Sequence, residues 1–227
     1  YRASDCKTYP FQATANGQTR ALVTADFNDP NLFWQWHYIN NADQAVATTP
    51  VAGADINVAD AWKLTAGNPE VIVAIVDAGV KYTHPDLAAN MWINPNPSPE
   101  YKNQDIHGWN FAADGPISWG QKGDSGHGTH VAGTVAAVNN NGIGVCGIAG
   151  GDGTPGSGVR LMSCQIFDEP GRDAATIEEI MVWTADHGAV ISQNSWGYAA
   201  TRAGRNASSY INPVHKEAID YFIKYAG

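Results

Sequence analysis

The stretch Gly-His-Gly-Thr-His-Val-Ala-Gly-Thr at residues 126–134 has the pattern of the start of a helix. Asp124 and Ser125 are candidate N-cap residues, and valines recur at helical spacing downstream. His127 then lies in the first turn, where unpaired backbone N–H groups and the helix dipole disfavour a positive charge on an imidazole. A histidine held neutral is suited to act as a general base. The same stretch also fits a capped, buried helix with two incidental histidines, so its meaning depends on the segments around it.

The composition of the 227 residues is that of a globular chain with enough apolar side chains for a core, at 44% hydrophobic residues. The formal net charge of -9 argues against a nucleic acid or an acidic membrane surface as partner. No apolar stretch approaches the roughly 18 residues needed to span a bilayer. The chain begins without Met and without a signal peptide, so we expect its true start to lie upstream.

Three cysteines, at positions 6, 146 and 164, are too few for a disulfide scaffold, and their spacing matches no zinc motif. Cys146 and Cys164 lie in apolar runs, so we expect both to be small buried hydrophobic residues.

Strand and helix patterns alternate along most of the chain. Residues 1–27 are rich in Thr, Ala, Gly and Gln and are interpreted as an extension or processing remnant, which leaves residues 28–227 as the folded domain. Buried strands are expected at residues 71–76, 108–111, 159–167 and 189–194. Helices are expected after residue 58 through Trp62 and Leu64 to an end at Gly67, from 127, from 177 to about 188, and from 211 to the end. This order predicts an α/β fold of three layers, a mostly parallel sheet with helices on both faces.

Two of these elements place side chains that can exchange protons at one edge of the predicted sheet. Asp77 directly follows the strand at 71–76, and His127 begins the next long helix. Functional groups of such folds gather beyond the carboxyl ends of the strands, so Asp77 is expected to accept a hydrogen bond from one ring nitrogen of His127. This contact would fix the tautomer and leave the other nitrogen as a base. An Asx-turn or a metal ligand is the alternative interpretation of Asp77.

A family resemblance joins these motifs. The segment 71–87, with Asp-Ala-Gly-Val at 77–80 and His-Pro-Asp-Leu at 84–87, resembles the aspartate region of subtilisin-like serine peptidases, the subtilases. Residues 127–134 resemble their histidine motif, and Ser-Trp-Gly at 195–197 resembles their substrate-binding strand, in the same order along the chain. The resemblance runs from about residue 28 to 227 and implies the N-terminal portion of a subtilisin-like catalytic domain, which hydrolyses peptide bonds by acyl transfer.

The resemblance also implies roles for individual residues. Asp77 would orient His127, and His127 would be the general base. An extended peptide would pair with the backbone at two places. These predicted substrate-binding residues are Ser195, Trp196 and Gly197, together with Phe167 and Gly171. No cofactor is required for this chemistry, and the resemblance to secreted members implies a secreted or extracytoplasmic endopeptidase.

Two motifs of the family are missing from these residues: the Gly-Thr-Ser-Met-like motif of the nucleophilic serine and the Ala-Gly-Asn-like motif of the oxyanion asparagine. Ser195 and Ser157 lack the strand–turn–helix context of that serine. The favoured explanation is a second, processed chain of the same precursor that carries the serine and stays associated. A truncated chain and a peptide-binding pseudo-protease are the alternatives.

Two metal hypotheses remain. In some relatives the Asp of the His-Pro-Asp motif and an asparagine loop bind calcium, so Asp86, Asn140 and Asn141 are candidate ligands, although a polar turn explains them equally well. A metal hydrolase that uses His127 and His130 is the weaker rival, because two histidines three residues apart without a glutamate motif are a poor zinc signal.

Overall fold

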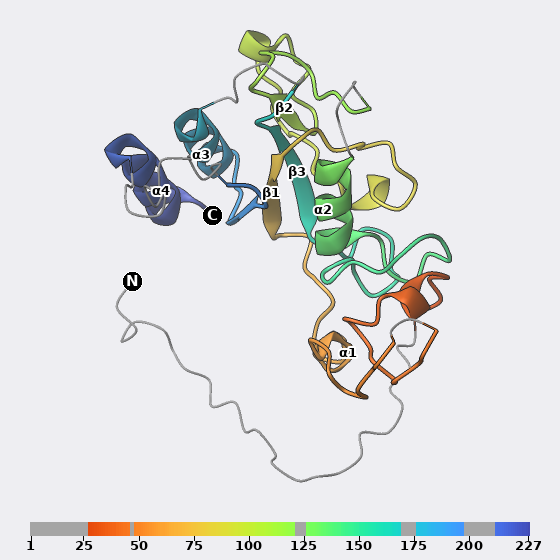
Figure 1. Ribbon diagram of the computed structural model, residues 1–227. Helices are drawn as coiled ribbons and strands as arrows, with labels where there is room; N and C mark the ends of the chain where they lie inside the picture. The colour runs from red at the N-terminus through yellow and green to blue at the C-terminus, as the bar shows by residue number, and fades with distance from the viewer. Residues whose placement is uncertain (1–26, 46–47, 121–125, 169–175, 198–211) are drawn as a thin grey trace.

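A computed structural model describes residues 27–45, 48–120, 126–168, 176–197 and 212–227 of this protein (Figure 1). Its centre is a sheet of four strands in the order β2-β3-β1-β4, and every pair of neighbours is parallel. The strands are β1 (Ile72–Asp77), β2 (Gly108–Asn110), β3 (Arg160–Gln165) and β4 (Ile191–Asn194). All four predicted strands are present, and the predicted parallel sheet is confirmed.

Helices cover both faces of the sheet (Figure 1). Helix α2 (His127–Ala136) lies on one face, and α3 (Ile177–Asp186) and α4 (Pro213–Tyr225) lie on the other. Helix α1 (Val58–Trp62) lies with the N-terminal segment beside this core. Three short 3-10 helices complete the described structure, at Leu32–Trp34, Ala88–Asn90 and Pro99–Tyr101.

The side chains of β1 alternate between the two faces, as expected for a strand. Val73 and Ile75 pack in the cluster under α2, whereas Ala74 and Val76 pack in the cluster under α3. Asp77 continues the first series, so its side chain leaves the strand on the face that α2 covers. The alternation of one buried strand thus directs the carboxylate toward the helix that carries His127.

Strand β4 differs from the prediction of a buried strand. Ile191, its first residue, is 48% exposed, and the strand contains no fully buried residue. Among the described strands β4 pairs with β1 alone, so it forms an edge of the sheet. The apolar run at 189–194 therefore predicted the strand but not its position at the edge.

The start of α2 also differs in detail. The predicted caps, Asp124 and Ser125, lie outside the described residues. The N-cap position is Gly126, which has a positive φ of 71° and has no side chain with which to cap the helix. His127 is the first helical residue, so its predicted place in the first turn is confirmed.

The predictions for the cysteines and the chain termini have different outcomes. Cys146 and Cys164 are both buried and free, as predicted, whereas Cys6 and residues 1–26 lie outside the described part.

None of the described helices has the length and apolar character of a membrane span.

Candidate active site

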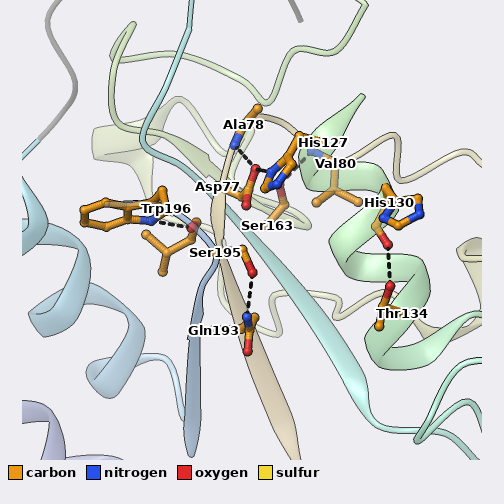
Figure 2. A network of polar contacts seen from close by, with 11 residues as sticks. Asp77, Ala78, Val80, His127, His130, Thr134, Ser163, Gln193, Ser195 and Trp196 are labelled. Atoms are coloured by element: carbon orange, nitrogen blue, oxygen red, sulfur yellow. Dashed lines mark hydrogen bonds and ion pairs between the residues drawn. The ribbon is translucent and has the colours of Figure 1, made fainter. Parts of the chain in front are cut away.

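Asp77 and His127 meet at the carboxyl end of β1 (Figure 2). Asp77 Oδ1 accepts hydrogen bonds from His127 Nδ1 and from the backbone N–H of Ala78, each at 2.7 Å. A carboxylate can only accept, so His127 carries its proton on Nδ1 and its Nε2 is the basic nitrogen. Asp77 is buried at 2% exposure, whereas the His127 side chain is 50% exposed. The hydrogen bond predicted from the sequence is therefore present, and it leaves an accessible imidazole.

The first turn of α2 lies directly against the turn that follows β1. A Cβ atom added to Gly128 would come within 2.1 Å of the carbonyl oxygen of Ala78, so only glycine fits this approach. Thr129 Oγ1 accepts a hydrogen bond of 3.0 Å from the backbone N–H of Lys81. These two contacts fix the helix start, and with it His127, relative to Asp77.

A polar network holds the other side of the same turn. A Cβ atom added to Gly79 would come within 1.6 Å of the Ser118 carbonyl oxygen. The Ser118 N–H donates to Gln165 Oε1 at 3.0 Å, and Gln165 Nε2 donates to Ser118 Oγ at 3.0 Å. Ser118 Oγ also donates to Asp168 Oδ1 at 3.2 Å. The turn with Asp77 is thus clamped between α2 and this network.

The sequence carries little sign of this network. Its one local signal is Gln165, a polar residue at the carboxyl end of a buried strand. In the sheet Gln165 lies opposite Asp77 and is 3% exposed. A buried amide must find hydrogen-bond partners, so Gln165 could have been flagged, whereas Ser118 gives no such signal in the sequence.

Two of the predicted substrate-binding residues form an aromatic pair next to this site. The Trp196 indole donates a hydrogen bond of 2.9 Å to the carbonyl oxygen of Val76, the residue before Asp77. The ring centroids of Trp196 and Phe167 are 5.8 Å apart in an edge arrangement. The indole is therefore fixed to the carboxyl end of β1, with Phe167 beside it.

The remaining candidates on the predicted substrate strand make fewer contacts. Ser195 Oγ accepts a 2.8 Å hydrogen bond from Gln193 Nε2 (Figure 2). A Cβ added to Gly197 would meet nothing within 4 Å, so open space surrounds this residue. Gly171 lies outside the described residues. The peptide-binding role of these residues stays a prediction.

Ser157, the other serine weighed as a nucleophile, lies in a loop. Its hydroxyl donates to the Thr154 carbonyl at 2.8 Å and accepts from the Asp152 N–H at 3.0 Å. Within the described part of the chain, the polar partners of Ser157 and Ser195 do not include His127. The geometry thus agrees with the absence of a serine motif in the sequence.

His130 lies one turn after His127 but belongs to a different surface. Figure 2 shows the His127 ring directed at Asp77 and the His130 ring directed away from it. His130 lines a cavity of about 720 Å³ together with His37 and His84. A zinc site that shares His127 and His130 therefore has no geometric support, and the described residues contain no group of three or more His, Cys, Asp or Glu arranged to hold a metal ion.

The predicted calcium ligands lie together, but their oxygens face N–H donors. Asp86 Oδ1 accepts from Asn141 Nδ2 at 2.8 Å, and Oδ2 accepts from the Val145 N–H at 3.0 Å. Asn140 Oδ1 accepts from the Asn28 N–H at 3.1 Å. As arranged, the three residues do not present converging oxygens to a cation. Calcium binding stays a prediction that these contacts do not support.

Asp29 is a further buried carboxylate beside this loop, and no pattern in the sequence marks it. Its Oδ2 accepts from the Asn140 N–H at 2.6 Å and from Cys146 Sγ at 3.2 Å. Burial raises the pKa of Asp86, an effect that hydrogen bonds from Val145 and Asn141 oppose and that the charge of Asp29 reinforces. The loop after α2 is therefore tied to two buried acidic side chains.

The comparisons with known proteins agree with these motifs. A sequence model described as the subtilase family matches residues 68–226. Neuroendocrine convertase 2 from Bos taurus is 35% identical over 140 residues, which is 62% of this chain and 20% of that protein. Halolysin from Haloferax mediterranei is 32% identical over 186 residues, which is 82% of this chain and 29% of that protein.

Solved structures show the same fold. The serine protease of Aeromonas sobria, in a complex with its chaperone, superposes with a TM-score of 0.60 at 22% identity and covers 90% of this chain and 30% of that one. The chain spans less than a third of the length of these relatives. Because the family model covers well over half of its residues, the chain belongs to the subtilase family.

Proposed function

We propose that this chain supplies the aspartate and the histidine of a serine endopeptidase, and that the nucleophilic serine and the oxyanion donor come from a part of the same protein outside these 227 residues. The observation that carries the proposal is the 2.7 Å hydrogen bond between His127 Nδ1 and the buried carboxylate of Asp77. Membership of the subtilase family supports the reaction class.

The geometry suits acyl transfer to a serine hydroxyl. With Nδ1–H donated to Asp77, Nε2 of His127 is the atom that takes the proton from the attacking hydroxyl and returns it to the leaving amine. The negative carboxylate of Asp77 then faces the imidazolium of His127 and stabilises its positive charge. The half-exposed ring of His127 is open to a peptide.

The surface around β4 supports a further part of the same protein. β4 is an edge strand among those described, and Ile191 on it is 48% exposed. On α4, Ile219 and Ile223 are one turn apart and are 43% and 57% exposed. Uncovered strand edges and exposed apolar side chains are each typical of interfaces. We expect the serine-bearing part, as a processed C-terminal chain of the same precursor, to cover this surface.

The substrate class in this proposal is an extended peptide or protein segment. Such a segment would pair with the backbone at residues 195–197 as an added strand. Trp196 and Phe167 would then contact apolar side chains of the substrate, because their rings meet beside Asp77. A secreted or extracytoplasmic location remains part of the proposal.

The test uses the full-length protein that contains this chain and a fluorophosphonate probe, which labels activated serines. We expect labelling of a serine outside these 227 residues, together with peptide hydrolysis. His127→Ala should abolish both, whereas the matched variant His130→Ala, one turn further along α2, should retain them. Mass spectrometry of the labelled species will show whether the serine lies on a second chain.

Three outcomes would contradict the proposal. Labelling that is unchanged in His127→Ala would remove this residue from the reaction. Peptide binding without labelling or hydrolysis would indicate a pseudo-protease, and hydrolysis lost on chelation without labelling would indicate a metal hydrolase.

A further inference from the structure

Three buried polar side chains form a row across the carboxyl ends of neighbouring strands. Gln165 of β3 lies opposite Asp77 of β1 on one side and opposite Asn110 of β2 on the other. Residues in register on neighbouring strands present their side chains to the same face of the sheet. All three are at most 3% exposed. The proposed catalytic aspartate is thus one member of a polar row, and the two amides of that row need hydrogen-bond partners.

The carboxylate of Asp168, a residue just past the end of β3, accepts from both amides. Its Oδ1 accepts from Gln165 Nε2 at 3.3 Å and from Asn110 Nδ2 at 3.3 Å. Ser118 Oγ donates to the same oxygen at 3.2 Å. The protons are consistent with this arrangement, because each amide nitrogen has two and gives the other one to Ser118 Oγ. One carboxylate oxygen therefore joins the ends of β2 and β3 to the loop that contains Ser118.

Asp168 directly follows Phe167, one of the residues proposed to contact the substrate. The backbone after β3 pairs with β1 as far as Ile166, whose N–H donates to the carbonyl oxygen of Asp77 at 2.9 Å. Beyond that point the carboxylate of Asp168 and the ring of Phe167 continue the attachment, with the ring centroid 5.8 Å from that of Trp196. Phe167 is 36% exposed, so its ring is open to a ligand. The contacts that hold Asp168 therefore also limit where the Phe167 ring can lie.

The pair of Asp77 and His127 is held by contacts that do not pass through Asp168. On one side the start of α2 lies against the turn after β1. On the other side Ser118 and the buried amide of β3 share two hydrogen bonds of 3.0 Å. Removal of the Asp168 carboxylate should therefore displace the ring of Phe167 and leave the pair in contact.

We propose that Asp168 is a positioning residue for Phe167: its carboxylate fixes the ring of Phe167 beside Trp196 and thereby sets a preference for an apolar side chain of the peptide substrate. The inference rests on the proposed function for its kinetic consequence. Its structural claim stands on the three hydrogen bonds of Asp168 Oδ1 and on the contact of the two rings.

The test compares three variants of the full-length protein. Asp168→Ala removes the acceptor oxygens, whereas Asp168→Asn keeps one acceptor of the same shape and should restore part of the function. Asp105→Asn is the matched control. Asp105 is fully buried and accepts from Asn94 Nδ2 at 2.8 Å and from the Ser98 N–H at 3.1 Å. It precedes the amino end of β2, whereas Asp168 follows the carboxyl end of β3, so only the Asp168 variants should affect substrate binding.

The kinetic readout is a split between KM and kcat. Peptide substrates that carry either an apolar residue or alanine at one position, scanned along the peptide, locate the position that contacts Phe167. For Asp168→Ala we expect KM for the apolar substrate to rise about tenfold, kcat to change less than about twofold, and the preference over alanine to be lost. In a Phe167→Ala background the same substitution should have no further effect on KM, because it acts through the ring. An equal rise of KM in both backgrounds, or the same rise in Asp105→Asn, would overturn the inference.

A spectroscopic readout separates this inference from the proposed function. The indole N–H proton resonance of Trp196, assigned by its absence in Trp196→Phe, reports the position of the neighbouring Phe167 ring. It should change its chemical shift in Asp168→Ala, change less in Asp168→Asn, and stay in place in Asp105→Asn. A stability loss in Asp168→Ala without a shifted resonance would overturn the inference and leave Asp168 a packing residue. If the wild-type protein shows no peptidase activity, the proposed function fails, and the NMR comparison still decides whether Asp168 positions Phe167.

Discussion

The contact between Gly128 and the turn after β1 gives a sharp mutational test. In Gly128→Ala the new methyl group would lie 2.1 Å from the carbonyl oxygen of Ala78, so α2 and the turn must separate by about 1 Å. Overpacking of this kind costs about 1–3 kcal/mol, and the better helix propensity of alanine offsets about 0.5–1 kcal/mol of it. We expect the free energy of unfolding to fall by about 0.5–2 kcal/mol.

The same movement should reduce activity more than stability. His127 precedes Gly128, so separating the helix from the turn displaces the imidazole from Asp77. A misplacement of about 1 Å costs about 100-fold in rate for well-oriented groups. Denaturant unfolding and kcat/KM, both measured on the full-length protein, report the two effects.

Gly133→Ala is the matched control on the same helix. Nothing lies within 4 Å of a Cβ atom added there, so the substitution should stabilise by about 0.5–1 kcal/mol and leave activity unchanged. If the two variants have equal stability and equal activity, α2 is not held against the turn, and the positioning argument for His127 is wrong.

Three further predictions concern the carboxylates and Trp196. Asp77→Asn should lower kcat by about 10⁴-fold with little change in KM, since the amide no longer enforces the Nδ1–H tautomer of His127; steady-state kinetics checks this. Trp196→Phe keeps an aromatic ring but loses the hydrogen bond to Val76, so we expect a stability loss of about 1 kcal/mol in denaturant unfolding, and no loss would contradict that bond. Burial raises the folded-state pKa of Asp86 above its ordinary value of 3.8, so protonated Asp86 stabilises the fold at low pH and this stabilisation is lost as the pH rises through the folded-state pKa. The free energy of unfolding, plotted against pH, should therefore vary less in Asp86→Asn than in the wild-type protein. Parallel curves for the two proteins would refute the raised pKa of Asp86.

The central pair of the site was predictable because each member is marked by its own local sequence. Asp77 ends an unbroken apolar strand rich in β-branched residues, and His127 starts a helix with small residues at the contact. In a parallel sheet, the end of a strand and the start of the following helix meet at one edge, so local patterns determined a contact between residues 50 positions apart.

The supporting contacts were not predictable, because they depend on register and on loops. Ser118 and Gln165 are 47 residues apart, and Asp29 and Cys146 are 117 apart. Neither pair belongs to a periodic pattern, and a register shift of one residue would turn Gln165 to the other face of the sheet. The exposure of Ile191 was missed for a related reason, since an apolar run identifies a strand but not the number of its neighbours.

Strand β1 is the only described strand that carries a candidate catalytic residue, and it is paired on both sides, with β3 and with β4. Its amides should therefore be among the slowest in the protein to exchange with deuterium, whereas His127 is the first residue of α2, where the backbone N–H groups have no acceptor within the helix. On warming, the histidine side of the pair should loosen before the aspartate side. Heat inactivation would then begin below the melting temperature of the sheet and would be reversible on cooling.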